Sequence, residues 1–270
     1  MKILIVLVLL VLLVMVLVPI YWACVMAFDE SALIEMPNPP RMWPEKFSLF
    51  NFKYAFSVMP FLRYFGNTLF VTVVNTVISV FTALMCGYAF SKGKFKFKRF
   101  WFIFMLAVMM IPFEARMIPL FLQFQRAHML NTYWPLILGG FAYSYGMFLS
   151  KQNIDKIPDS LRESAFMDGA SEWTVFLRII IPLSKPVIAT MCILQSIVNW
   201  NNFLWPMIVI SKKNMQLISV GIAVNSASET AQYYGPTMAV AILSAIPIIL
   251  VFLFLQKNIV ENMAFSGIKE

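Results

Sequence analysis

The stretch Leu161-Arg-Glu-Ser-Ala-Phe-Met-Asp-Gly169 lies in a short polar region between long apolar segments, and Ile179-Ile-Ile-Pro182 follows it ten residues on. Between Lys151 and Lys185 the chain carries five basic and five acidic side chains, so this polar region has no net charge. Membrane surfaces attract segments with an excess of Lys and Arg, whereas a neutral, mixed-charge surface suits a protein partner. The stretch therefore predicts a docking site for a soluble protein.

The composition excludes an ordinary soluble domain. Of the 270 residues, 60% are hydrophobic and 13% are charged, and the mean hydropathy is +0.77, whereas soluble domains carry about 25% charged residues. One histidine and three scattered cysteines argue against a metal site or a catalytic triad. The sequence has no phosphate-binding loop of the form G-x-x-x-x-G-K-[ST]. We therefore expect a non-catalytic membrane protein with no cofactor, metal or ATP of its own.

Long apolar runs predict an all-α polytopic membrane protein with six transmembrane helices in a single domain over residues 1–270. Each run can cross about 30 Å of hydrocarbon at about 1.5 Å per residue, and continuous apolar runs in lipid form helices. The first run is longer than the apolar part of a signal peptide, which favours an uncleaved helix. The expected helices cover about 3–28, 64–91, 100–124, 129–150, 186–211 and 230–256, with the polar segment 151–185 between the fourth and the fifth.

A basic loop predicts the orientation. Five positive and no negative side chains lie between the second and third expected helices, namely Lys92, Lys94, Lys96, Lys98 and Arg99. Basic loops face the cytoplasm, so six spans place both termini and segment 151–185 there as well. The positive charge of the chain is therefore a topology signal, and nucleic acid is not an expected partner. Binding of lipid headgroups is a second possible role of this loop.

Within the polar segment, two short helices with a tight bend between them are expected. Pro158 suits the first turn of one helix, and Gly169 ends it by adopting a backbone conformation that other residues resist. Ser171 can cap the second helix, and Pro182 interrupts the chain after it. The second helix carries an apolar stripe of Val175, Phe176, Ile179 and Ile180.

The segment resembles the EAA motif of ABC-importer permeases, E-A-A-x3-G-x9-I-x-L-P. Glu163, Ala165, Gly169, Ile179 and Pro182 match at the right spacing, whereas Ser164 replaces an Ala and Ile181 a Leu. Other motifs resemble the second permease subunit of carbohydrate importers of the maltose type. They are Asn51-Phe-Lys-Tyr54, Asn67-Thr-Leu69, Ile118-Pro-Leu-Phe121, Leu130-Asn-Thr132, Phe148-Leu149, Asp168-Gly-Ala170 and Trp200-Asn-Asn-Phe-Leu-Trp-Pro206.

The resemblance implies a type I ABC importer permease in a prokaryotic inner membrane, which forms the pathway for a mono- or oligosaccharide. It implies three kinds of partner: a second permease, two cytoplasmic ATPase subunits that bind ATP and Mg, and an extracytoplasmic solute-binding protein. The residues implied to contact the ATPase are Glu163, Ser164, Ala165, Asp168 and Gly169. Alternatives within the family are a permease for glycerol 3-phosphate, polyamine or another solute. A different alternative is an ATP-independent secondary transporter, for which the chain has few membrane-embedded charges.

Five residues are candidates for the substrate pathway. Asn199, Trp200 and Asn202 lie near the outer end of the fifth expected helix, where amides can pair with sugar hydroxyls and an aromatic face can stack on a sugar ring. Glu114 and Arg116 are the strongly charged residues of the third. The competing interpretations are interfacial Trp anchoring, and an ion pair or an interfacial break after Pro112 for the charged residues.

Overall fold

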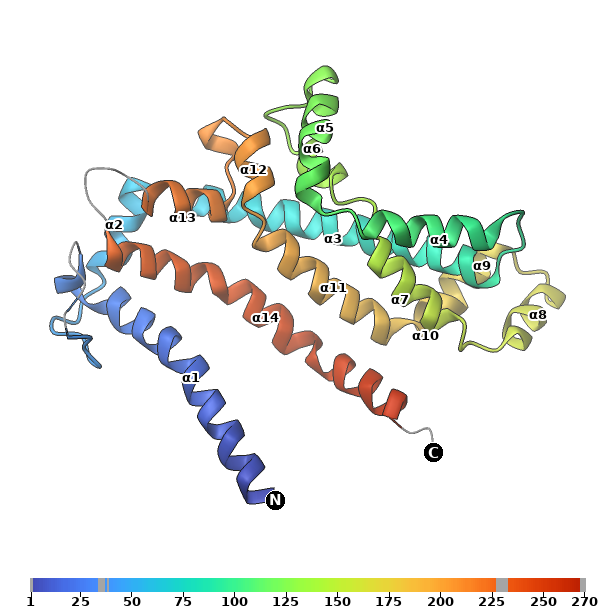
Figure 1. Ribbon diagram of the computed structural model, residues 1–270, viewed down its shortest axis with the longest axis horizontal. Helices are drawn as coiled ribbons and strands as arrows, with labels where there is room; N and C mark the ends of the chain where they lie inside the picture. The colour runs from blue at the N-terminus through green and yellow to red at the C-terminus, as the bar shows by residue number, and fades with distance from the viewer. Residues whose placement is uncertain (1, 34–36, 38, 227–232, 268–270) are drawn as a thin grey trace. The chain divides into compact units, whose positions relative to one another are not determined.

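The computed structural model describes residues 2–33, 37, 39–226 and 233–267, which form helices joined by loops (Figure 1). No strand occurs in these ranges, where Asp29 and Phe47 form an isolated antiparallel bridge. The chain divides into two compact units. The first comprises Met1–Asn67 and Gln216–Pro247, and the second Thr68–Met215 and Ile248–Glu270.

The first unit is built around the end of a long apolar helix. Its elements are α1 (Lys2–Phe28), η1 (Glu30–Ala32), α2 (Phe50–Val58), the start of α3 (Phe61–Lys92), α13 (Ile218–Ser226) and the first part of α14 (Tyr234–Gly267). Asn51, which is fully buried, donates hydrogen bonds to the carbonyl groups of Met26, Ala27 and Asp29 at 3.1, 3.3 and 2.8 Å. These bonds fix α2 against the end of α1.

The second unit contains most of α3 and the helices that follow it. They are α4 (Lys98–Met109), α5 (Phe113–Arg126), α6 (Trp134–Leu138), α7 (Ser144–Ile154), α8 (Asp159–Met167), α9 (Glu172–Val175), a π-helical turn (Phe176–Ile180), α10 (Ile181–Leu183), α11 (Lys185–Trp200), α12 (Leu204–Val209) and η3 (Lys213–Met215). The part of α14 after Pro247 also belongs to this unit.

Three helical stretches of the described chain are long and apolar enough to cross a membrane, namely Ile3–Phe28, Phe61–Lys92 and Tyr234–Gln256. Two further pairs pass the same test together but are bent: α4 with α5 by 97°, and Glu172–Leu183 with α11 by 78°. By length and composition the chain therefore has three to five candidate spans. The six-span arrangement stays a prediction.

Prolines interrupt two of the expected helices. The helix expected over 100–124 breaks between Met109 and Phe113, because Pro112 lacks an N–H and restricts the residue before it. The helix expected over 186–211 stops at Trp200 and resumes as α12, which contains Pro206. The last helix begins at Tyr234 and continues beyond the expected 256, whereas 230–232 lie outside the described residues.

The helix expected over 129–150 is corrected to two shorter ones, α6 and α7. Before α6, His128 and Asn131 adopt left-handed backbone conformations with φ of 56° and 58°. After α6, Gly139 and Gly140 lead into an irregular stretch that ends at α7. Glycine disfavours a continuing helix because it loses more conformational entropy than other residues.

Side chains donate hydrogen bonds to the carbonyl groups at this interruption, and the Pro135 carbonyl also accepts the N–H of Gly139. Asn75 Nδ2 donates to the carbonyl oxygens of residues 136 and 137 at 3.0 and 2.9 Å, and Ser79 Oγ donates to Gly140 at 2.9 Å. Trp205 Nε1 donates to the carbonyl oxygen of Pro135 at 3.0 Å. Irregular backbone is tolerated at membrane depth only where such partners replace water. The polar residues of α3 therefore stabilise the interruption.

Candidate functional site

The polar region of the sequence folds into two short helices, α8 and α9, with a glycine bend between them. Gly169 has a φ of +79°. The N–H of Ala170 donates to the carbonyl oxygen of Ala165 at 2.9 Å, and that of Gly169 donates to Phe166 at 3.0 Å. These two bonds form a Schellman motif. Gly169 therefore ends α8 in the way that the sequence predicts.

The second helix begins at a side-chain cap and ends at a bend. Ser171 Oγ accepts a hydrogen bond from the N–H of Thr174 at 3.2 Å, as expected for a cap residue. The helical path continues through the π-helical turn to Leu183, and the chain then bends by 78° into α11. Val175, Phe176 and Ile180 of the expected apolar stripe are buried.

The inner face of this hairpin packs on a hydrophobic cluster of the second unit. The cluster contains Val80, Ala83 and Leu84 of α3, together with Ile154, Val175, Phe176, Ile180 and Met191. Ala165, Phe166 and Ala170 are partly buried against it. The hairpin is therefore attached to α3 and α11 by apolar contacts.

The outer face of α8 is exposed in the described structure. Glu163, Ser164 and Asp168 are exposed, and Met167 is 88% exposed. Leu161 is 46% exposed. The outer face of α8 thus presents polar and apolar side chains to the surroundings of the chain.

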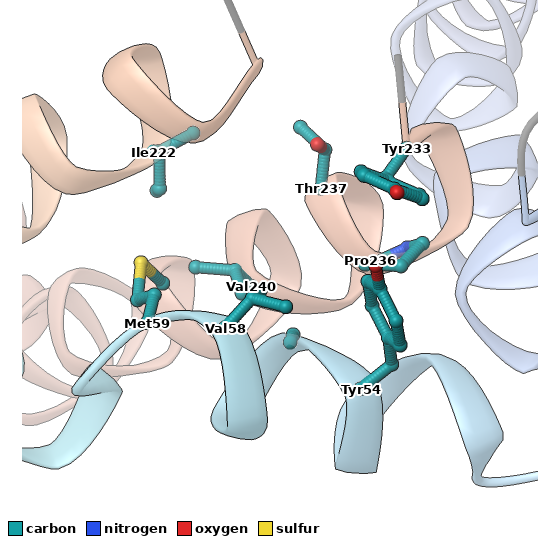
Figure 2. Close-up of a pocket in the computed structure, with 9 residues that line it drawn as sticks. Tyr54, Val58, Met59, Ile222, Tyr233, Pro236, Thr237 and Val240 are labelled. Carbon is teal, nitrogen blue, oxygen red and sulfur yellow. The ribbon is translucent and has the colours of Figure 1, made fainter. Parts of the chain in front are cut away.

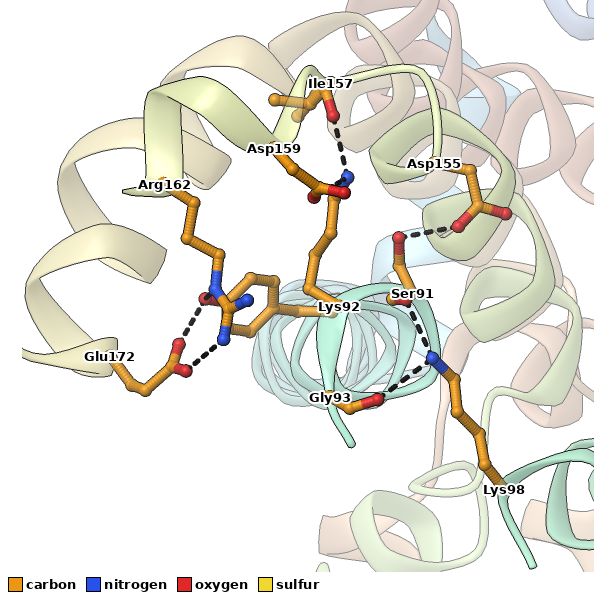
Figure 3. A network of polar contacts seen from close by, with 10 residues as sticks. Ser91, Lys92, Gly93, Lys98, Asp155, Ile157, Asp159, Arg162 and Glu172 are labelled. Atoms are coloured by element: carbon orange, nitrogen blue, oxygen red, sulfur yellow. Dashed lines mark hydrogen bonds and ion pairs between the residues drawn. The ribbon is translucent and has the colours of Figure 1, made fainter. Parts of the chain in front are cut away.

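An ion pair joins the two short helices and connects them to the end of α3 (Figure 3). Arg162 of α8 pairs with Glu172 of α9, and the hydroxyl group of Tyr88 donates to the same carboxylate. Arg162 also donates from Nε to the Tyr88 oxygen at 3.3 Å and lies 4.9 Å from the centre of the Phe166 ring. We call Tyr88, Arg162 and Glu172 the clamp.

A second set of contacts holds the start of α8 to the last turn of α3. Lys92 Nζ lies 2.7 Å from Asp159 Oδ1 and donates to the carbonyl oxygen of Ile157 at 2.7 Å. The Lys92 side chain is only 8% exposed. Ser91 donates to Asp155 Oδ1 at 2.6 Å. The first half of α8 is therefore bound to α3 at two points, through Asp159 and through Arg162.

The acids of these contacts are held in their charged form. Burial would raise the pKa of Glu172, but hydrogen bonds from Arg162 and Tyr88 outweigh it and lower the pKa below its ordinary 4.5. The hydrogen bond from Lys92 lowers the pKa of Asp159 below 3.8. A lowered folded pKa adds stability that is complete above the unfolded value and is lost as the pH falls through the folded value. At neutral pH both contacts are therefore fully formed.

The first unit contains a cavity of about 280 Å³ between α2, α13 and the start of α14 (Figure 2). Its lining is mostly apolar, and Tyr54 and Tyr233 stand at one side with ring centres 5.0 Å apart. A hydrogen bond that the Tyr54 hydroxyl group donates to Tyr233 raises the pKa of Tyr54. The two hydroxyl groups thus partner each other.

The sequence of this chain matches a family model over residues 75–264, which include α8 and α9. The family is described as the binding-protein-dependent transport system inner membrane component. The chain belongs to this family. It is a permease of the ABC importer type, a multi-pass inner membrane component that is itself non-catalytic. The alternative of an ATP-independent secondary transporter therefore has no support.

Similar permeases include two arabinooligosaccharide transport system permease proteins named AraQ. The protein from Halalkalibacterium halodurans is 32% identical over 227 residues, which cover 84% of this chain and 81% of that protein. The protein from Bacillus subtilis is 33% identical, with 84% and 80% covered. The lactose transport system permease protein LacG of Rhizobium radiobacter is 31% identical, with 75% and 74% covered.

A solved structure shows the same fold. A chain of a bacterial ABC transporter involved in the import of the acidic polysaccharide alginate superposes with a TM-score of 0.83, and 95% of both chains is covered at 24% identity. The helical ABC importer permease fold that the sequence predicts is therefore confirmed, although the number of spans is not.

The predicted pathway residues of helix α11 lie in the interior of the permease. Asn199 is 8% exposed and donates to Asn75 Oδ1 at 2.9 Å, and Gln195 donates to the same oxygen at 3.2 Å. Trp200 is 4% exposed, and Asn202 is partly buried. Asn199 thus supports the side chain that holds the interrupted segment in place.

The structure places Glu114 and Arg116 in the first turns of α5, directly after the break at Pro112. Both side chains are exposed, and no ion pair joins them in the described ranges. The residues that sequence reasoning missed are Tyr88, Arg162 and Glu172. The only available signal was the opposite charge of Arg162 and Glu172 on neighbouring short helices.

Proposed function

We propose that this permease forms one half of the translocation pathway of an ATP-driven carbohydrate importer. It pairs with a second permease, binds two cytoplasmic ATPase subunits that carry ATP and Mg, and receives substrate from an extracytoplasmic binding protein. Both termini and the α8–α9 hairpin face the cytoplasm in this arrangement, because the basic loop between α3 and α4 follows the positive-inside rule.

The observation that carries the proposal is that α8 has one exposed face and one face packed against the rest of the permease. Its outer face exposes Glu163, Ser164 and Met167, whereas its inner face packs on α3 and α11. A helix with one face anchored and one face uncovered is suited to transmit the motion of a partner to its own core. The partner is the ATPase, since the exposed residues belong to the stretch that resembles the EAA motif.

The contacts around α8 support a mechanism in which α3 receives the motion. ATP binding brings the ATPase subunits together and displaces α8, and the clamp and the Lys92–Asp159 pair then move the end of α3 with it. Such a displacement shifts the permease between two packings only if ATP-bound ATPase binds one of them more tightly. Hydrolysis removes this preference and returns the permease to its resting packing.

Carbohydrate is the substrate class that the relatives favour, because the similar AraQ and LacG proteins are named for arabinooligosaccharides and lactose. In the proposed pathway, Asn199 supports Asn75 at the interrupted segment and Trp200 is buried near it in sequence as a candidate for substrate contact. The exposed aromatic side chains of Phe141 and Tyr145 lie in and beside this segment. Asn202, Glu114 and Arg116 are the other candidates for substrate contact. Glycerol 3-phosphate and polyamine are the alternative substrates.

The docking assignment predicts which residues crosslink to the ATPase. In a variant without Cys24, Cys86 and Cys192, we expect Ser164→Cys or Met167→Cys to form crosslinks with the ATPase subunit, since both side chains point away from the permease core. Ala165→Cys is expected to react less, because Ala165 is partly buried. Ser57→Cys on α2 is the control and gives no ATPase crosslink. Crosslinks of Met167→Cys to the binding protein would refute the assignment.

The substrate class is tested on the intact complex in proteoliposomes with its binding protein. We expect oligosaccharides to stimulate ATP hydrolysis several-fold, because a loaded binding protein favours the packing that ATP-bound ATPase also prefers. Glycerol 3-phosphate and spermidine serve as comparisons of different charge. Stimulation by either of these but by no sugar would leave the importer assignment intact and reject carbohydrate.

A further inference from the structure

A cavity of about 400 Å³ lies where α3 ends, α4 begins and α7 passes them. Three of its lining side chains are cationic and none is acidic, and we call it the basic cavity. It is lined by Phe90, Ser91, Lys98, Arg99, Phe102 and Lys151. Small-molecule sites have volumes of roughly 300–1,000 Å³, so the basic cavity has room for a ligand.

The three cations differ in how far the protein neutralises them. Lys98 Nζ donates to the carbonyl oxygens of Ser91 and Gly93 at 2.8 and 3.0 Å, at the end of α3 (Figure 3). Lys151 Nζ lies 2.6 Å from Asp155 Oδ2. The Arg99 guanidinium group forms no ion pair with any residue that the structure describes. The cavity therefore keeps an excess of positive charge, centred on a guanidinium group that is free to bind an anion.

The position of the basic cavity along the chain matches the level of lipid headgroups. It adjoins Lys92, the last residue of a helix that is long and apolar enough to cross the membrane. In the loop that follows, Phe95 and Phe97 are 43% and 76% exposed and alternate with Lys94 and Lys96. Aromatic and basic side chains mark the interface between hydrocarbon and water.

We infer that the basic cavity binds the phosphate group of an anionic phospholipid. The Arg99 guanidinium presents two parallel N–H groups that match two phosphate oxygens, and Lys98 and Lys151 add positive charge. Phe90 and Phe102, whose ring centres are 5.6 Å apart, provide apolar walls for the rest of the lipid. The inference goes beyond the proposed transport function. It takes from that proposal only the orientation, which places the basic cavity at the cytoplasmic leaflet of the membrane.

Binding is measured by native mass spectrometry of the permease in its intact complex with the ATPase subunits, titrated with phosphatidylglycerol or phosphatidylcholine in detergent. We expect preferential retention of phosphatidylglycerol, and about tenfold weaker retention by Arg99→Gln, because one charge-assisted contact is lost. Arg99→Lys keeps the charge without the fork and is expected to lie between the two. Lys94→Gln removes the same charge from the loop before α4, outside the cavity, and is expected to bind like the wild type.

Four outcomes would overturn the inference. Equal losses in Arg99→Gln and Lys94→Gln would show attraction by the loop as a whole, and equal retention of the two lipids would show that charge is not recognised. Inorganic phosphate that competes as strongly as the lipid would assign the cavity to a free anion. Loss of the ATPase subunits from complexes that carry Arg99→Gln, with lipid retention unchanged, would assign it to a protein partner.

Discussion

Gly169→Val is expected to reduce ATP-driven uptake at least tenfold, whereas Gly66→Val is expected to leave it near the wild-type rate. At both positions a Cβ atom would meet no other atom within 4 Å, but only Gly169 has a φ in the left-handed region, at +79°. A left-handed conformation costs an L-residue roughly 1–2 kcal/mol, and more when the residue is β-branched. The strain is relieved by unwinding the end of α8, which displaces the surface proposed to contact the ATPase.

This prediction is checked by measuring uptake together with the amount of ATPase that co-purifies with the permease. Gly169→Val is expected to insert in the membrane as well as Gly66→Val does, because its Cβ produces no clash in the core. Uptake and ATPase binding that remain normal in Gly169→Val would rule out the role of this bend in docking.

Arg162→Glu is expected to separate ATP hydrolysis from transport. The change places two acids side by side in the clamp, where Arg162 is 23% exposed and Glu172 56% exposed. An ion pair this exposed stabilises the folded protein by only about 1 kcal/mol. Two acids in its place repel each other, so the contact then destabilises the attachment of α8 to α9. The outer face of α8 is unaltered, so the ATPase subunits still bind and hydrolyse ATP. Transport per ATP is expected to fall about fivefold to tenfold, because α8 no longer moves α3 efficiently.

The double variant Arg162→Glu with Glu172→Arg restores the ion pair with its charges exchanged and is expected to recover much of the transport. Lys156→Glu is the control, since Lys156 is exposed and the change in charge is the same. Equal defects in the single and double variants, with a normal control, would mean that Arg162 serves docking and is not part of a link to α3.

The local geometry of the α8–α9 hairpin was predictable because it depends on residues close in sequence. Gly169 forms a left-handed bend, Ser171 caps the helix that follows it, and Pro182 lacks an N–H. Each of these effects involves backbone groups only a few residues away. The apolar runs predicted helices for a similar reason, since lipid requires each backbone group to find a partner nearby.

The features that sequence reasoning missed depend on residues far apart in the chain. Tyr88 lies 84 positions before Glu172, and Asn75 lies 61 positions before the carbonyl group of Leu136 to which it donates. The apolar run over 129–150 also predicts an unbroken helix, whereas the structure has an interruption there. Hydropathy cannot predict this interruption, because it depends on hydrogen bonds from Asn75, Ser79 and Trp205, which are distant in sequence. Asn199 is a further example: its amide group donates to Asn75 inside the protein, and its contact with substrate stays a prediction.

Helix α3 carries both sets of polar anchors, with Asn75 and Ser79 at the interrupted segment and Tyr88 and Lys92 at the α8–α9 hairpin. From residue 75 to residue 92 there are 17 steps, which at about 1.5 Å each separate the two sets by roughly 25 Å. Both sets belong to one continuous helix, so a displacement of its end at the hairpin would reach the interrupted segment through the helix itself. The interrupted segment and the hairpin proposed to contact the ATPase are thus joined by a single helix.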